Sequence, residues 1–153
     1  MARLSAGLLL YRRRGREIEV LLAHMGGPFW SRKDAGAWSL PKGEYEGDEE
    51  PLAAARREFA EELGLPAPAG RALDLGTIKQ AGGKVVQAWA LEGDLDTDAV
   101  RSNSFELEWP RGSGTVRSFP EVDRAAWFDL QSARAKLVKG QGGFLDRLSG
   151  LLG

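Results

Sequence analysis

The sequence has no cysteine and a single histidine, His24, among its 153 residues. The absence of cysteine excludes disulfides, thiol nucleophiles, iron–sulfur clusters and cysteine zinc sites. One histidine cannot form a multi-histidine metal site within one chain, and we interpret His24, at the end of a predicted strand, as structural rather than catalytic. Any bound metal would therefore be held by carboxylates, which favour hard cations such as Mg²⁺ or Mn²⁺.

Long apolar runs and an excess of one charge are also absent. No apolar stretch reaches the roughly 18 residues of a membrane-spanning helix, and residues 1–7 lack the layout of a signal peptide. We therefore expect a cytoplasmic protein without membrane contact. The net charge of −1 gives no basic footprint for duplex nucleic acid. The length and the 42% hydrophobic content predict a single domain over residues 1–153.

The pattern of apolar residues predicts strands around one central helix. Strands are expected at residues 4–11, 18–24, 71–80, 84–91, 105–109 and 125–128, and the first two pairs are typical of hairpins. Residues 26–37 form a predicted loop, and further helices are expected at about residues 130–138 and 144–152. This order favours an α/β fold, an α/β/α sandwich with a mixed β-sheet between helices.

The central helix is expected from about residue 49 to residue 63. Its apolar positions recur at helical spacing and form one stripe: Leu52, Ala55, Phe59 and Leu63. We expect Asp48 to cap its N-terminus, Pro51 to lie in its first turn and Gly64 to end it.

Glu58, Glu61 and Glu62 lie on one face of this helix, at about 100° per residue. A solvated face is the simplest interpretation of three such glutamates. However, like charges at this spacing repel by about 0.2–0.5 kcal/mol per pair. Glu61 and Glu62 also occupy the last turn, where the helix dipole disfavours anions by about 0.3–1 kcal/mol. A bound cation explains this arrangement better.

The residues before the helix make the pattern more specific. Gly43 would allow close approach of the backbone to a ligand, and Lys42 can meet a phosphate. The spacing is Gly43, five residues, Glu49, seven residues, then the run Arg57-Glu58-Phe59-Ala60-Glu61-Glu62-Leu63-Gly64-Leu65. This segment, residues 43–65, resembles the signature box of the Nudix hydrolases at every fixed position. Phe59 stands where the family more often has an aliphatic residue.

Other segments resemble Nudix landmarks in the same order along the chain. They are Ser5–Tyr11, Glu19–Leu22, Trp38–Gly43 and Trp127–Leu130. The resemblance implies a Mg²⁺-dependent enzyme, with Mn²⁺ as an alternative ion, that cleaves a phosphoanhydride bond by attack of water on phosphorus. The landmarks are most similar to the branch of nucleoside triphosphate pyrophosphohydrolases and diadenosine polyphosphate hydrolases, so we expect a small nucleotide-type substrate. A homodimer is common in this family.

The resemblance also implies roles for particular residues. Metal ligands are expected at Glu58, Glu61 and Glu62 and at the Gly43 carbonyl, and one glutamate, with Glu58 named first, is expected to act as general base. Arg57 and Glu49 are expected to orient the helix and the loop.

Several expectations concern residues outside the box. Many relatives place a further acidic residue on a loop facing the metals, and Glu121 is our candidate, although a solvated loop position fits it equally well. Glu106 and Glu108 are weaker candidates. Arg32 and Lys33 are candidates for contacts with extra phosphates. Two tryptophans, Trp38 and Trp109, are candidates for stacking on a base, although aromatic residues beside leucines are more often part of a core.

A binding module that has lost its chemistry is the alternative from another functional class. Such Nudix-fold modules typically show eroded glutamates in the box. None of the glutamates at Glu49, Glu58, Glu61 and Glu62 is lost here, and this favours an active hydrolase.

Overall fold

The computed structural model of the protein describes residues 3–153. Its main element is a seven-stranded sheet in the order β3-β2-β1-β6-β5, with β4 paired to β1 and β9 paired to β2. The strands are β1 (Arg3–Arg14), β2 (Glu17–Met25), β3 (Trp38–Ser39), β4 (Lys42–Glu44), β5 (Leu73–Lys79), β6 (Lys84–Glu92) and β9 (Val122–Asp129). β1 and β6 run parallel and the other pairs run antiparallel, so the sheet is mixed.

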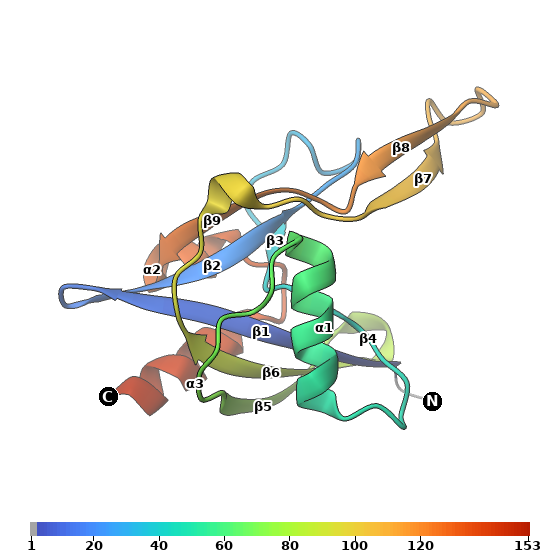
Figure 1. The fold of residues 1–153 in the computed structure, drawn as a ribbon. Coiled ribbons are helices and arrows are strands. Elements are labelled where there is room, and N and C mark those ends of the chain that lie inside the picture. The colour runs from blue at the N-terminus through green and yellow to red at the C-terminus, as the bar shows by residue number, and fades with distance from the viewer. Residues whose placement is uncertain (1–2) are drawn as a thin grey trace.

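Helices cover both faces of this sheet (Figure 1). They are α1 (Pro51–Leu63), α2 (Leu130–Lys136) and α3 (Gly142–Leu152), and two short 3₁₀ helices, η1 (Ala81–Gly83) and η2 (Thr97–Ala99), lie in connections. The buried residues of α1 pack with one set of strand side chains, whereas α2 and α3 pack with the other set. The predicted α/β/α sandwich with a mixed sheet is therefore confirmed.

Strand β1 lies at the centre because both of its faces are apolar. Leu8 and Leu10 belong to the core cluster beneath α1, and Leu9 belongs to the cluster beneath α3. A strand covered on both faces carries a continuous hydrophobic run, which explains the sequence from Leu8 to Leu10. The predicted hairpins β1–β2 and β5–β6 are both present.

A second sheet contains β7 (Ser104–Glu108) and β8 (Val116–Pro120) and projects from the body of the protein (Figure 1). Phe105 and Leu107 are half-buried while Glu106 and Glu108 are exposed, so the alternation predicted for β7 is confirmed. Strand β8 was not predicted, because its sequence shows no comparable alternation.

The start of α1 differs from the prediction. The helix begins at Pro51, and the N-cap is Glu50, whose carboxylate accepts hydrogen bonds from the backbone of Leu52 and Ala53. The assignment of the cap to Asp48 was therefore wrong. At the other end, Gly64 adopts the left-handed conformation with φ of 71°, as expected for a residue without a Cβ.

Two short strands near the start of α1 were also missed. Trp38–Ser39 pairs with β2 as β3, and Lys42–Glu44 pairs with β1 as β4. The sequence indicated only a turn there, because two or three residues carry no visible alternation. Within residues 3–153, no helix has the length and apolar character needed to span a membrane.

Candidate active site

The candidate site lies where α1 passes β4. The apolar stripe of α1 buries Ala55, Phe59 and Leu63 against the sheet. This packing turns Glu58 and Glu62, which are one helical turn apart, toward the edge of the helix that faces β4. Both side chains are partly buried, so they are not part of a freely solvated helix face.

Gly43 and Glu58 are in direct contact at this edge. A Cβ built on Gly43 would lie 2.0 Å from Oε2 and 2.1 Å from Cδ of Glu58. Gly43 itself is held in place by antiparallel pairing with Ala6 of β1. Only glycine allows the carboxylate to approach the backbone this closely, because any side chain would overlap it.

Burial perturbs the protonation of both glutamates. It raises the pKa of Glu62 to about 8, and the negative charges of Glu121 and Glu58 add to this effect, whereas the Lys42 ammonium and its backbone N–H oppose it. Burial also raises the pKa of Glu58, against the opposing effect of Arg57. Two carboxylates with raised pKa values at one place indicate a shortage of positive charge there.

Lys42 supplies part of the missing positive charge. Burial, followed by the charge of Lys84, lowers the pKa of the Lys42 ammonium, and the charges of Glu62, Glu44 and Glu58 oppose this shift. The predicted substrate-binding residue Lys42 therefore lies among the candidate ligands. The contribution of Lys84 was missed by the sequence, since Lys84 lies on the distant strand β6.

Glu121, between β8 and β9, acts on the same pair of glutamates. Its charge raises the pKa of both Glu58 and Glu62. Its backbone N–H donates to the Asn103 carbonyl at 2.9 Å, and its carbonyl accepts from Gly26 N–H at 2.9 Å. The segment between β8 and β9 is thus held at a defined position beside α1. Glu106 is exposed on β7, and Glu108 instead accepts from the backbone of Gly112.

Arg57 joins the helix to the loop before it. Its Nε and Nη2 donate to the two oxygens of Glu49 at 2.8 and 2.9 Å. Its Nη1 donates to Glu58 at 2.9 Å and to Glu61 at 3.2 Å. These bonds raise the pKa of Arg57, and the bond to Arg57 lowers the pKa of Glu49. Arg57 thus orients Glu58 and also bonds the side chain of Glu61, which is 47% exposed.

The donor set fits a hard divalent cation. Carboxylate oxygens of Glu58, Glu62 and Glu121 and the carbonyl oxygen of Gly43 are the ligand types that Mg²⁺ and Mn²⁺ prefer. A cation would also supply the charge that the buried carboxylates lack. Within the described part of the chain, no three acidic or histidine side chains already converge in metal-binding geometry; one candidate, Glu61, is bonded to Arg57.

The other predicted substrate-binding residues lie apart from the carboxylates. Arg32 and Lys33 are exposed on the loop between β2 and β3. Trp38 is only 3% exposed, its ring packs edge-on against His24 and Phe128, and its Nε1 donates to Asp34. The expectation that Trp38 stacks on a base is therefore corrected, because its ring is enclosed in the core.

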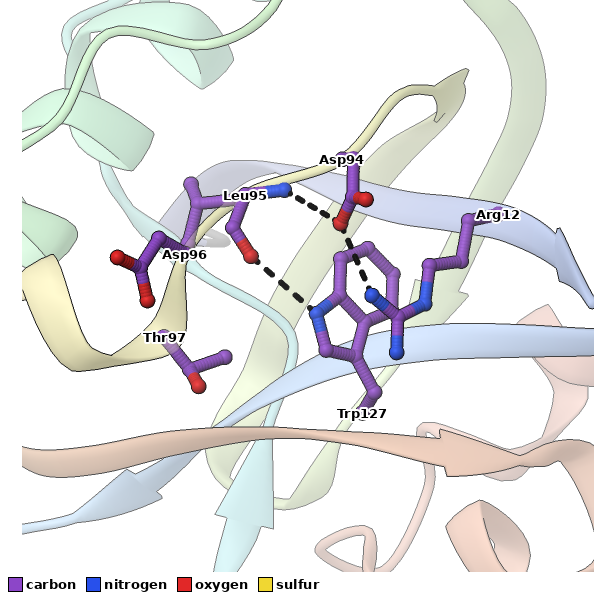
Figure 2. A pocket seen from close by; sticks show the side chains of 6 residues that line it. All are labelled: Arg12, Asp94, Leu95, Asp96, Thr97 and Trp127. Atoms are coloured by element: carbon purple, nitrogen blue, oxygen red, sulfur yellow. Dashed lines mark hydrogen bonds and ion pairs between the residues drawn. The ribbon is translucent and has the colours of Figure 1, made fainter.

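One cavity is lined by none of the candidate carboxylates; Figure 2 shows the residues that line it. It has a volume of about 590 Å³ and is lined by Arg12, Asp94, Leu95, Asp96, Thr97 and Trp127. Its polar groups already bond to one another: Arg12 donates to Asp94, and Trp127 donates to the Leu95 carbonyl. The Arg12 guanidinium also covers the Trp127 ring, 4.1 Å from its centre. We interpret this network as structural.

A second cavity, of about 490 Å³, adjoins the candidate site. Glu49 and Arg57 form part of its wall, together with Arg3, Leu4, Glu44, Tyr45, Glu46 and Gly47. It opens beside the loop that leads from β4 to α1. Neither cavity is lined by the candidate cation ligands themselves, but the second cavity shares Glu49 and Arg57 with the candidate site.

Comparisons with known proteins agree with the fold and with the family resemblance. The family described as NUDIX domain matches residues 1–148. Among solved structures, an Ap4A hydrolase of C. elegans in a binary complex is similar, with 23% identity, 97% coverage of each chain and a TM-score of 0.69. The NUDIX domain of Shewanella oneidensis NrtR, complexed with ADP ribose, has 17% identity, 100% and 90% coverage and a TM-score of 0.67.

A third similar structure is the C-terminal domain of mouse MUTYH in complex with human PCNA, with 16% identity, coverage of 99% of this chain and 90% of that chain, and a TM-score of 0.62. No curated protein matches the chain in sequence. At these identities, the structural likeness shows a shared fold.

Proposed function

The chain belongs to the Nudix family, and we propose that it is a Mg²⁺-dependent hydrolase that cleaves a phosphoanhydride bond in a nucleoside diphosphate-linked substrate. The observation that carries this proposal is the close contact of Glu58 with Gly43, beside Glu62 one helical turn away, with the charge of Glu121 acting on both carboxylates. Burial raises the pKa of two of these carboxylates, so the site favours a cation. Arg57 and Glu49 support it from the loop side.

Each residue has a proposed task. Glu58, Glu62, Glu121 and the Gly43 carbonyl would hold the cation, and Glu61, which is bonded to Arg57, would be a further ligand. When bound, the ion would offset negative charge on the non-bridging phosphate oxygens and lower the pKa of a bound water. We assign Glu58 as the base that accepts the proton of the attacking water, because its carboxylate is held against Gly43 and oriented by Arg57.

The bond changes balance with water as the only co-reactant. The water oxygen bonds to phosphorus, its proton passes to Glu58, and the bridging P–O bond breaks with its electron pair staying on the leaving phosphate oxygen. Lys42 lies beside the carboxylates and can bind a phosphate oxygen. We assign Arg32 and Lys33 to outer phosphates and favour a nucleoside triphosphate or a dinucleoside polyphosphate as substrate.

A binding module without chemistry is the second candidate. The observation that favours it is the similar NrtR domain, which is complexed with ADP ribose. In such a module, nucleotide binding would persist without product formation. The intact glutamates of the box favour the enzyme.

A panel of substrates decides between the two functions. The protein is incubated with Mg²⁺ and nucleoside triphosphates, dinucleoside polyphosphates or nucleotide sugars, and the products are separated by chromatography. Glu58→Gln is expected to remove the activity, whereas Glu106→Gln, at an exposed position on β7, is the matched control. If no panel member is hydrolysed and calorimetry detects no Mg²⁺ binding, the proposed enzyme function is wrong; nucleotide binding without turnover supports the binding module.

A further inference from the structure

His24 is the only histidine in the sequence and is completely buried at the end of β2. Its Nδ1 lies 2.7 Å from Oδ1 of Asp123, on β9. Its Nε2 lies 2.6 Å from the carbonyl oxygen of Lys33, in the loop between β2 and β3. The ring thus connects two segments that are far apart in the sequence, and it also packs edge-on against Trp38 at 4.9 Å.

The contact with Asp123 falls on an irregularity in the sheet. The pairing of β2 with β9 shifts register between His24 and Met25, where His24 pairs with Arg124 and Met25 pairs with Val122. Asp123 is therefore the extra residue of a β-bulge. Bulges bend the strand and are frequent next to active sites, where they re-aim a side chain. His24 contacts this extra residue through the Asp123 carboxylate.

The bulge comes two residues after Glu121. The carbonyl of Glu121 accepts from Gly26 N–H at 2.9 Å, and Gly26 follows His24 by two residues on the other strand. A Cβ on Gly26 would lie 2.0 Å from the Pro120 carbonyl oxygen, so the two segments are in backbone contact. His24 therefore secures both sides of this junction, through Asp123 on one side and the Lys33 carbonyl on the other.

We propose that the His24–Asp123 pair is a positioning device for Glu121: it fixes the bulge and thereby the place of the Glu121 carboxylate beside Glu58 and Glu62. This inference rests on the proposed function, in which Glu121 is a cation ligand. Both His24 and Asp123 act as positioning residues, without contact to the cation or the substrate. Arg124, which lies 3.6 Å from Asp123, is the other charged group at the pair.

The test compares Asp123→Ala, which removes the carboxylate beside His24, with Asp123→Asn, whose amide keeps a hydrogen-bonding partner for Nδ1. Amide hydrogen exchange of Gly26 and Glu121 reports the junction without metal or substrate. Binding of Mn²⁺ by calorimetry reports the site. Asp34→Ala is the control, because it removes a carboxylate of the neighbouring loop that bonds Lys136 and Trp38 without touching the bulge.

For Asp123→Ala, we expect faster exchange at Gly26 and Glu121 and an affinity for Mn²⁺ about 10-fold lower, the size of effect typical of outer-shell partners. Asp123→Asn should restore most of the affinity, and Asp34→Ala should leave it unchanged. In a Glu121→Gln background, Asp123→Ala should cause no further loss. His24→Phe, which retains the ring packing, should act in the same direction as Asp123→Ala.

Unchanged exchange at Gly26 and Glu121 in Asp123→Ala would overturn the inference. So would faster exchange together with an undiminished affinity for Mn²⁺, because the pair would then be merely structural. Failure of the unaltered protein to bind Mn²⁺ would instead overturn the proposed function. In that case, the exchange rates still decide whether the pair fixes the Glu121 segment.

Discussion

Gly43 and Glu58 are packed so closely that a Cβ on Gly43 would lie 2.0 Å from Oε2 of Glu58. Glycine at this position therefore determines where the carboxylate can lie. We expect Gly43→Ala to displace Glu58 and to lower both the cation affinity and the hydrolytic rate by about 10- to 100-fold. Calorimetry with Mn²⁺ and steady-state kinetics measure the two losses.

Gly47→Ala is a matched control for this substitution. Gly47 lies in the same connection between β4 and α1, but a Cβ there would meet no atom within 4 Å. Its replacement should leave affinity and rate within about twofold of the original values, since exposed loop substitutions rarely disturb a distant site. Equal losses for both variants would show that the loop, rather than the contact with Glu58, is responsible.

Glu62 makes the stability of the metal-free protein depend on pH. Its ordinary pKa of 4.5 rises to about 8 in the folded protein. Between these values, the folded state keeps a proton that the unfolded chain loses, so stability is expected to decrease as pH rises through this range. Glu62→Gln stays neutral and should not show this decrease. Its advantage in melting temperature over the unaltered protein should therefore grow from about pH 5 to about pH 9.

Addition of Mg²⁺ tests whether ionisation of Glu62 causes the loss of stability at high pH. An ion bound to the ionised carboxylates stabilises the folded state, so Mg²⁺ should reduce the advantage of Glu62→Gln at high pH. Glu106→Gln is the control, since Glu106 is exposed on β7 and lies outside the proposed set of cation ligands. A melting temperature of Glu62→Gln below that of the unaltered protein at high pH would mean that Glu62 serves the fold.

Much of this arrangement follows from periodicity in the sequence. The stripe that includes Phe59 and Leu63 predicted which face of α1 is buried, and the apolar residues from 4 to 11 predicted the strand that became β1. The box residues at Glu58 and Glu62 are close in sequence and share a helix, so helical geometry alone brings them together.

The features that were missed depend on contacts between distant segments. Asp123 meets His24 across 99 residues of sequence, and no local pattern indicates the bulge that brings them together. The burial of Trp38 depends on Phe128 and His24, which lie on other strands. Strand β4 forms because its residues pair with β1. A run of three residues is too short to show this pairing in the sequence.

The N-terminus of α1 offers a test of the corrected cap. Glu50 accepts hydrogen bonds from Leu52 and Ala53, whereas Asp48 is exposed and lies outside the helix. Glu50→Ala should therefore lower the free energy of unfolding by about 1 kcal/mol, and Asp48→Ala should leave it nearly unchanged. Chemical denaturation of both variants measures the difference. A larger loss of stability for Asp48→Ala than for Glu50→Ala would show that Asp48 is the N-cap.

Trp38 should influence stability rather than substrate binding. Trp38→Phe retains an aromatic ring but loses the hydrogen bond to Asp34, so the free energy of unfolding should decrease by about 1 kcal/mol. The KM for a nucleotide substrate should not change, because the ring is enclosed by His24 and Phe128. A several-fold rise in KM without loss of stability would contradict the structural role and would place Trp38 at the substrate.

Arg57 and Glu49 should affect activity far more than stability. Their side chains are 39% and 30% exposed, so the ion pair itself contributes only about 0–1 kcal/mol to folding. Arg57→Lys removes the paired bonds to Glu49 and frees Glu58, and we expect a loss of rate of about 10-fold or more. Glu49→Gln should cause a similar loss, and the double variant should lose little more than either single one, because both act on Glu58. Arg56→Lys is the neighbouring control, since the Arg56 side chain donates to the Pro68 and Gly70 carbonyls. If the losses of rate for the Arg57 and Glu49 variants were fully additive in the double variant, the two residues would act independently.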